Sequence, residues 1–143
     1  MIRLACLLFT VSLGASAAEY RSVQDNAAVL YDAPSRAATP LFVVQRNYPL
    51  EVIVNLEAWV KVRDHAGALT WIEKKSLGEK RTLLVTGASA EARLRPEDAA
   101  PAVFSAAQNV VVELVEVAPN GWLRVRHADG ATGYVRAAQV WGD

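Results

Sequence analysis

The chain has 143 residues, of which 52% are hydrophobic, with 15 basic and 15 acidic side chains. This length suits one ordinary domain or two very small ones. The balanced charge argues against nucleic-acid binding driven by a basic surface.

The first 17 residues are predicted to be a cleaved signal peptide. Arg3 supplies a basic start, residues 4–14 are apolar but too short to span a bilayer, and Ala15-Ser16-Ala17 provides small residues for cleavage after Ala17. Cleavage one residue later and retention as an anchor are the alternatives. Because Cys6 is the only cysteine, the mature chain would have no disulfide, no thiolate chemistry and no cysteine metal ligand. No later segment is apolar enough to be transmembrane, so a periplasmic or otherwise exported protein is predicted.

A tandem repeat dominates the rest of the sequence. Residues 59–63 (WVKVR) return 63 residues later as residues 122–126 (WLRVR), and the same offset relates Gly67 to Gly130 and Trp71-Ile72 to Tyr134-Val135. A constant offset over a whole hairpin indicates one supersecondary unit copied in tandem. We therefore predict two units, at residues 19–80 and 88–143. Because about 60 residues is near the lower limit for independent folding, the units are expected to pack on each other.

Both units are predicted to consist of strands, which makes the fold class all-β. Extended segments are predicted at residues 50–54, 59–63, 69–72, 110–117, 123–126 and 132–135. Asn120-Gly121 and Asp129-Gly130 are strong hairpin signals between the strands of unit two. Residues 74–77 and 137–140 are predicted to be one-turn connectors. Residues 81–87 join the units, and because Arg81–Thr86 is β-prone we predict a connecting strand, with a plain loop as the alternative.

Each unit carries W-x-[KR]-V-R, a turn glycine, an aromatic-aliphatic pair and a short connector, and this pattern resembles the bacterial SH3-like domain. Unit one is similar in particular to the exported bacterial SH3 family, at Trp59, Val62, Arg63, Asp64, Gly67, Trp71, Ile72, Leu77, Arg81, Thr82, Leu83, Leu84 and Val85. The resemblance implies two small SH3-like barrels in tandem. It is specific for the fold and says little about function, because this fold hosts many unrelated roles.

Residues 132–140 of unit two and Leu30-Tyr31-Asp32 of unit one also resemble segments of eukaryotic signalling SH3 domains, which hold proline-rich helices between stacked aromatic side chains. Unit one keeps Tyr31, Trp59 and Trp71 but has Glu73 and Ser76 where the resemblance implies a proline and a second tyrosine. The residues of unit two that depart from the pattern are Arg93, Leu94, Arg95, Arg136 and Gln139. These departures argue against recognition of proline-rich peptides in the eukaryotic manner.

Two tryptophans are predicted to lie on the polar face of their strands. Val60 and Val62 alternate with Trp59, Lys61 and Arg63, so the second set shares the outward face. The equivalent residues of unit two are Trp122, Arg124 and Arg126. An exposed indole beside cations is a candidate platform for a ligand that carries carboxylates. The alternative is that each tryptophan is covered by its own loop, with an arginine stacked on it for stability. The resemblance adds three candidates for this face: Tyr31, Trp71 and Tyr134.

The sequence offers no support for catalysis, a cofactor or a metal site. The mature chain has no cysteine nucleophile and no G-x-S-x-G motif. His65 and His127 lie in predicted exposed turns without other ligands at suitable spacing. Glu97-Asp98 lies in a Pro/Ala-rich loop where nothing would desolvate the carboxylates. Trp141, two residues from the end, is expected to pack against its own barrel.

Export, a tandem SH3-like repeat and the absence of catalytic groups favour a non-catalytic binding module of the bacterial cell envelope. The resemblance implies peptidoglycan or a peptide as its ligand. The alternative is a structural or adaptor subunit that docks onto a larger envelope protein complex through loops such as residues 35–40 and 97–101. A wall-binding module would bind purified sacculi by itself, whereas an adaptor would need its protein partner.

Overall fold

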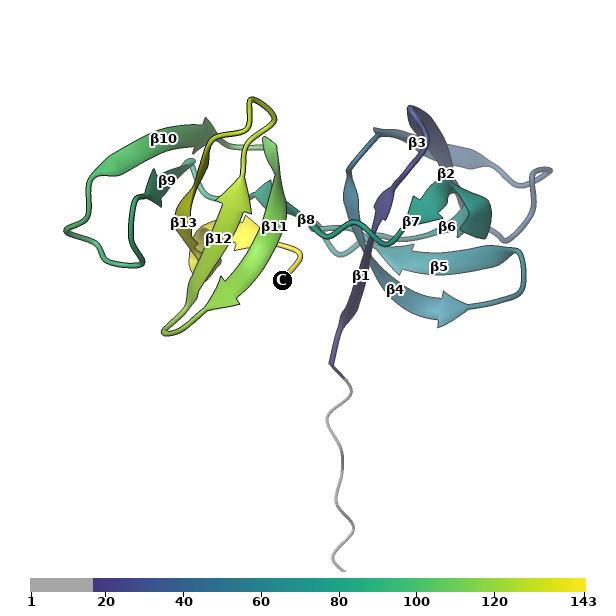
Figure 1. The fold of residues 1–143 in the computed structure, drawn as a ribbon. Coiled ribbons are helices and arrows are strands. Elements are labelled where there is room, and N and C mark those ends of the chain that lie inside the picture. Colours follow the sequence, from purple (N-terminus) through teal and green to yellow (C-terminus); the bar gives the residue numbers. More distant parts are fainter. Residues whose placement is uncertain (1–16) are drawn as a thin grey trace, which may run out of the picture.

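Two seven-stranded antiparallel sheets make up the structure, a computed structural model that describes residues 17–143 (Figure 1). Within this range there is no α-helix, which confirms the all-β prediction. The two predicted connectors are single 3-10 turns. The predicted signal peptide lies outside the described residues except for Ala17.

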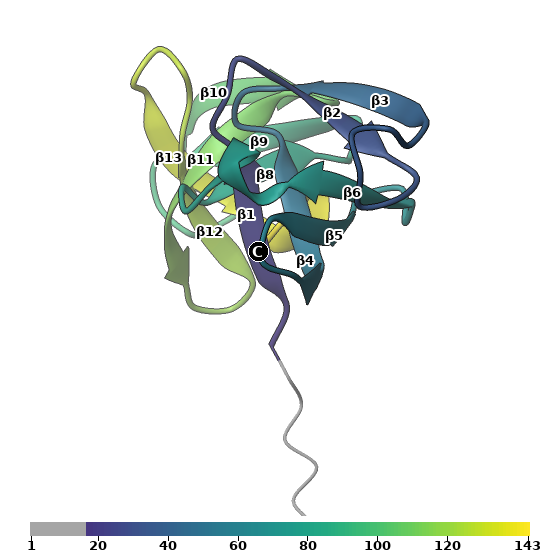
Figure 2. The same cartoon turned by 90° about the vertical axis from the view of Figure 1, so that its right-hand side faces the viewer.

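Unit one forms the first sheet. Its elements are β1 (Glu19–Val23), β2 (Ala27–Tyr31), β3 (Pro40–Gln45), β4 (Pro49–Asn55), β5 (Trp59–Arg63), β6 (Leu69–Glu73), the 3-10 turn η1 (Lys74–Ser76) and β7 (Leu77–Gly78). Their order across the sheet is β3-β2-β6-β5-β4-β1-β7, so β3 and β7 are the edge strands. The hairpins of this sheet are seen from the side in Figure 2.

Unit two repeats this arrangement. Its elements are β8 (Thr82–Val85), β9 (Ser89–Arg93), β10 (Ala102–Ala107), β11 (Val111–Ala118), β12 (Trp122–Arg126), β13 (Thr132–Arg136), the 3-10 turn η2 (Ala137–Gln139) and β14 (Val140–Trp141). The order is β10-β9-β13-β12-β11-β8-β14. Because β8 pairs with β11 and β14, the segment between the predicted units contains a strand of the second sheet.

The repeat offset changes in the middle of each unit. From β5 and β12 onward the equivalent residues are 63 apart, whereas in the preceding strands the register places equivalent residues 62 apart. Asn47 and Asn109 are equivalent residues at the shorter offset. Each lies just before the fourth strand of its unit in chain order, and each has the left-handed backbone conformation, with φ of 72° and 71°. The fourth strands differ in length: β4 has seven residues and β11 has eight. One extra residue in β11 therefore explains the change of offset.

Each unit has its own hydrophobic core. Val60 and Val62 are 2% and 0% exposed, as the alternation in β5 predicts. The buried cluster of unit one comprises Val23, Ala28, Leu30, Val44, Leu50, Val60, Val62, Ile72 and Leu77. That of unit two comprises Leu83, Val85, Ala90, Ala92, Ala106, Val112, Leu123, Val125, Val135 and Val140. Burial of one valine, leucine or isoleucine side chain contributes about 1.5–3 kcal/mol, so each unit is stabilised by its own core.

The two units pack against each other, as predicted. The Thr82 hydroxyl in β8 donates a hydrogen bond to the carbonyl of Asn47 in unit one at 2.6 Å. The sequence predicts that Trp141 packs against its own barrel; the structure adds a contact with unit one, in which its ring meets that of Tyr20 edge to face, at 5.2 Å between centroids. Because each barrel is too small to bury much apolar surface by itself, an aromatic contact between the units stabilises both of them.

Candidate ligand-binding site

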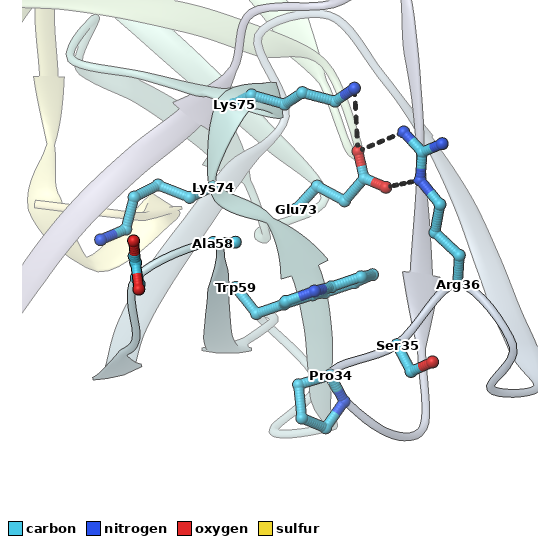
Figure 3. A pocket seen from close by; sticks show the side chains of 9 residues that line it. Pro34, Ser35, Arg36, Ala58, Trp59, Glu73, Lys74 and Lys75 are labelled. Atoms are coloured by element: carbon cyan, nitrogen blue, oxygen red, sulfur yellow. Dashed lines mark hydrogen bonds and ion pairs between the residues drawn. The ribbon is translucent and has the colours of Figure 1, made fainter.

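A groove of about 640 Å³ lies at one end of unit one, where three segments meet (Figure 3). The loop between β2 and β3 forms one wall, the loop between β4 and β5 forms a second, and the end of β6 with η1 forms the third. The lining residues are Pro34, Ser35, Arg36, Glu57, Ala58, Trp59, Glu73, Lys74 and Lys75. The groove thus combines one large aromatic ring with charges of both signs.

Local hydrogen bonds fix the loop between β2 and β3. Asp32 accepts a hydrogen bond from the Thr39 amide through its carboxylate at 2.9 Å, and the Asp32 amide donates to the Thr39 carbonyl at 3.1 Å. The Ala38 amide closes a turn on the carbonyl of Ser35 at 3.1 Å. Such side-chain bonds to nearby backbone groups are the usual way in which aspartate shapes a turn. The closed loop holds Arg36 against the end of β6.

Arg36 and Glu73 form a two-point ion pair across the groove (Figure 3). The second of these contacts, from Arg36 Nη2 to Glu73 Oε2, is 3.2 Å long, and Lys75 Nζ lies 3.4 Å from the same carboxylate. The hydrogen bond from Arg36 holds the pKa of Glu73 below its ordinary value of 4.5, and Lys75 acts in the same direction. Glu73 is therefore an ionised and already satisfied carboxylate at neutral pH.

Trp59 forms the aromatic floor of the groove and is half-buried. Its ring meets Tyr31 edge to face, with 5.6 Å between centroids and 80° between planes. Tyr31 in turn is registered with Trp71, which is registered with Lys61, so these three candidates form a row across β2, β6 and β5. The structure thus brings four of the candidates predicted for unit one together on one outward face, next to the groove.

Two charged residues of the groove are available to a ligand. Within residues 17–143, neither Lys74 nor Glu57 lies within 4.0 Å of an oppositely charged group. Both line the same groove as Trp59. An ammonium group and a carboxylate beside an indole can hold a ligand that carries both charges next to an apolar or sugar-like face.

The equivalent position in unit two is closed. Trp122 is only 4% exposed, and the guanidinium carbon of Arg136 lies 4.2 Å from the centre of its ring. Arg136 also pairs with Asp98, at 2.5 Å between Nη2 and Oδ2. The predicted exposed platform is therefore wrong for Trp122, and the alternative of a stacked arginine describes it correctly. The reason is the arginine side chain, which is long enough to cover the ring and reach the loop carboxylate.

The ion pairs of the two units have opposite polarity. Arg136 occupies the position of Glu73, and Asp98 occupies that of Arg36. Both pairs tie the loop after β2 or β9 to the end of β6 or β13. In unit one the residue on the strand is the anion, Glu73, whereas in unit two it is the cation, Arg136. Exchange of the two charges thus distinguishes the open groove from the closed one.

The remaining basic candidates are engaged within their own sheets. Arg63 pairs with Glu51 and Arg126 pairs with Glu113, each at 3.4 Å. Arg124 lies 4.0 Å from the carboxylate of Glu116. Tyr134 is half-buried and registered with Arg93 and Arg124. None of these residues lines the groove of unit one.

Sequence reasoning missed the residues that give the groove its charge: Arg36, Glu57, Glu73, Lys74 and Lys75. A signal for the first loop was present, since Pro34-x-x-Ala37-Ala38 returns as Pro96-x-x-Ala99-Ala100. Its offset is 62 rather than 63, so a comparison at one offset misses it. Alignment of these two loops at the offset of 62 shows that Arg36 of unit one and Asp98 of unit two are equivalent positions with opposite charges.

The histidines are separate from the groove. His65 is exposed and its Nδ1 lies 3.0 Å from the Tyr48 hydroxyl, whereas His127 is half-buried with its ring 5.5 Å from that of Phe104. In the part of the chain that the structure describes, no three or more side chains of metal-ligating type gather at one place. The same part contains no helix with the length and hydrophobicity needed to cross a membrane.

Comparison with known proteins identifies the family. No curated protein matches the sequence. Two similar solved structures, NlpC2 and NlpC1 from Trichomonas vaginalis, have 15% and 16% identity and a TM-score of 0.41 each, covering 89% and 98% of this chain and 49% and 51% of theirs. An NlpC/P60 family protein from Bacillus cereus ATCC 10987 has 16% identity and a TM-score of 0.39, covering 86% of this chain and 56% of its own. The chain thus spans about half the length of these structures.

The sequence model of the bacterial SH3 domain matches twice, over residues 24–79 and 87–142. Because these matches include most of the chain, it belongs to the bacterial SH3 domain family, in two tandem copies.

Proposed function

We propose that the protein is a non-catalytic, exported binding module and that the groove beside Trp59 binds peptidoglycan. Bacterial SH3 domains are binding modules, and the chain consists of two of them. The observation that carries the proposal is the difference between the copies: Trp59 keeps an open face in a groove with free charges, whereas Arg136 covers Trp122.

The chemistry of peptidoglycan suits this groove. Its glycan strands present neutral sugar rings, and its stem peptides carry free carboxylates and amines. An indole ring packs well on the apolar face of a sugar, and Lys74 and Glu57 offer one charge of each sign to a stem peptide. The ion pair between Arg36 and Glu73 holds the loop wall in place, so little ordering is needed on binding.

Co-sedimentation of residues 18–143 with purified sacculi tests the proposal. Wild-type protein is expected to pellet with sacculi, and Trp59→Ala is expected to lower the affinity by about tenfold or more. The double variant Lys74→Ala/Lys75→Ala places in unit one the alanines that unit two has at positions 137 and 138, so its fold should be unaffected. It is expected to weaken binding, whereas Arg95→Ala, in the loop of unit two, is the control that should not.

Two outcomes would contradict the proposal. If wild-type protein does not bind sacculi, the adaptor hypothesis is favoured, and crosslinking in the intact envelope is the next step. If binding occurs but folded Trp59→Ala binds as well as wild type, peptidoglycan binds elsewhere on the protein. Circular dichroism of each variant shows whether its fold is intact.

A further inference from the structure

The free edge of β3 is an unusual surface for a small exported β protein. β3 is a terminal strand of its sheet, and residues 37–45 contain no charged side chain. Leu41, Phe42 and Val43 are 45%, 51% and 70% exposed. Natural edge strands are commonly protected from pairing by charges, prolines or bulges. Apart from Pro40 at its first position and an irregularity opposite Tyr31, β3 has none of these.

The backbone of this edge is unsatisfied at its centre. In the ladder with β2, the amide of Arg46 donates to the carbonyl of Asn26 at 3.2 Å. Because hydrogen bonding alternates along an antiparallel strand, Val44 and Phe42 also face β2, whereas Val43 directs its N–H and C=O away from it. Because β3 pairs with β2 alone within residues 17–143, no neighbouring strand satisfies the outward backbone groups of Val43.

A second groove, of about 750 Å³, runs along this edge. Consecutive residues 42–46 form one side of it. The turn at residues 64–68 and three residues of unit two, Leu84, Asn109 and Val111, form the others. This groove shares no lining residue with the groove beside Trp59. Its volume is within the range of ordinary ligand sites, and the contact between two domains is a common place for such sites.

The charged side chains and the histidine in this second groove already have partners in the chain. Arg46 donates two hydrogen bonds to the side chain of Asn26, at 2.9 and 3.2 Å. Asp64 accepts from the amides of Ala66 and Ala68, and His65 is bonded to Tyr48. The outward backbone groups of β3 therefore lie beside a groove that is largely apolar, in which the side-chain amides of Gln45 and Asn109 are the other polar groups.

The corresponding edge of unit two is different. Phe104, the equivalent of Phe42, packs on His127 at 5.5 Å and is half-buried. Ser105 occupies the position of Val43. Unit two thus provides a matched control for the free edge of unit one.

We propose that an extended apolar segment of a partner protein adds as a strand to the free edge of β3. Only a polypeptide backbone supplies donors and acceptors at the spacing of a strand edge, and alternate apolar side chains would fill the groove. A second copy of this chain fits less well, because Leu84, Asn109 and Val111 of unit two line the same groove, which leaves less room for a whole second sheet than for a single strand. This site is independent of the groove beside Trp59.

Selection from a random heptapeptide library on residues 18–143 tests this proposal. Peptides with alternating apolar residues are expected to be enriched. Val43→Pro removes the outward N–H at a position where an edge strand tolerates proline, and it is expected to weaken the selected peptides at least tenfold. Ser105→Pro, at the same position of β10, and Trp59→Ala are expected to leave their affinity unchanged.

Amide hydrogen exchange of the wild-type protein gives a second measurement that needs no variant. The Val43 amide is expected to exchange rapidly in the free protein and at least tenfold more slowly with a selected peptide bound, whereas the Ser105 amide should not change. Failure to enrich alternating apolar peptides, unchanged affinity in folded Val43→Pro, or unchanged exchange at Val43 would each overturn the proposal. Concentration-dependent dimers that Val43→Pro abolishes would also overturn it, because they would assign the edge to a second copy.

Discussion

Removal of the arginine that covers Trp122 should reveal how much that contact stabilises unit two. Arg136→Ala deletes a cation–π contact at 4.2 Å and an ion pair with Asp98. A partly desolvated cation–π contact contributes about 0.5–2 kcal/mol, and a surface ion pair about 0.2–1 kcal/mol. Because the side chain of Asp98 is 77% exposed, the ion pair belongs at the low end of its range. We therefore expect a loss of about 1–2 kcal/mol in the free energy of unfolding.

Glu73→Ala is the matched variant of unit one. It removes the ion pairs with Arg36 and Lys75, whose side chains are 69% and 70% exposed, and no stacking on an aromatic ring. The expected loss is below about 1 kcal/mol. Urea unfolding measures both free energies, and 19F NMR of 5-fluorotryptophan-labelled protein reports the solvent exposure of each indole separately. Arg136→Ala should expose Trp122 to solvent. Equal losses for the two variants, or an unchanged Trp122 signal, would refute the assignment of Arg136 as its cover.

Three further predictions follow from ionisation and packing. The folded pKa of Glu73 lies below 4.5, so its ion pair stabilises the protein fully above pH 4.5, and this stabilisation is lost as the pH falls through the folded pKa. Glu73→Gln should therefore flatten this part of the curve of unfolding free energy against pH, measured by urea unfolding. Burial raises the pKa of Tyr20 and of Tyr48 above 10.0, and the nearby carboxylates of Glu51 and Asp64 raise the pKa of Tyr20 and Tyr48 further, respectively. The stability that these two tyrosines contribute is complete below pH 10.0 and should be lost as the pH rises through their folded pKa values. Ultraviolet absorbance at the phenolate band would follow their ionisation. The buried Thr70 hydroxyl has no hydrogen-bond partner in the described part of the chain, so Thr70→Val should stabilise the protein by about 1 kcal/mol. Gly133→Ala, at the equivalent position of unit two, should cost about 1–3 kcal/mol, because the added Cβ would lie 2.8 Å from that of Ala92. Thermal unfolding should therefore show a higher midpoint for Thr70→Val and a lower one for Gly133→Ala.

Local sequence patterns predicted the strands well. The alternation at residues 59–63 correctly assigned Val60 and Val62 to the core, because in a strand the face of each side chain depends only on its position. The turns at Gly67 and Gly130 were also visible, since φ values of 88° and 93° favour glycine strongly. Periodicity and turn chemistry are local properties, so they can be read directly from a short window of sequence.

The site depended on contacts between distant residues and was predicted only in part. Strand alternation shows that Trp59 and Trp122 face outward from the core, but it does not show what lies above them. That depends on residue 73 or 136, which is registered with the tryptophan on the next strand, and on the loop residue that pairs with it. The packing of Trp141 on Tyr20 was missed for a similar reason, because it joins the two ends of the described chain.

The exchange of charge between the copies shows how a duplicated barrel can keep its fold while only one copy keeps an open groove. The ion pair ties a long loop to the end of a strand, and this task requires opposite charges but no particular direction. The direction matters only for the neighbouring ring: an arginine on β13 is long enough to lie over Trp122, whereas the shorter Glu73 on β6 leaves Trp59 uncovered. The two residues of the pair thus have a shared structural role and separate consequences for binding. The open groove of unit one is therefore a property of the direction of its ion pair, and it lacks the stabilising contact that Arg136 makes with Trp122.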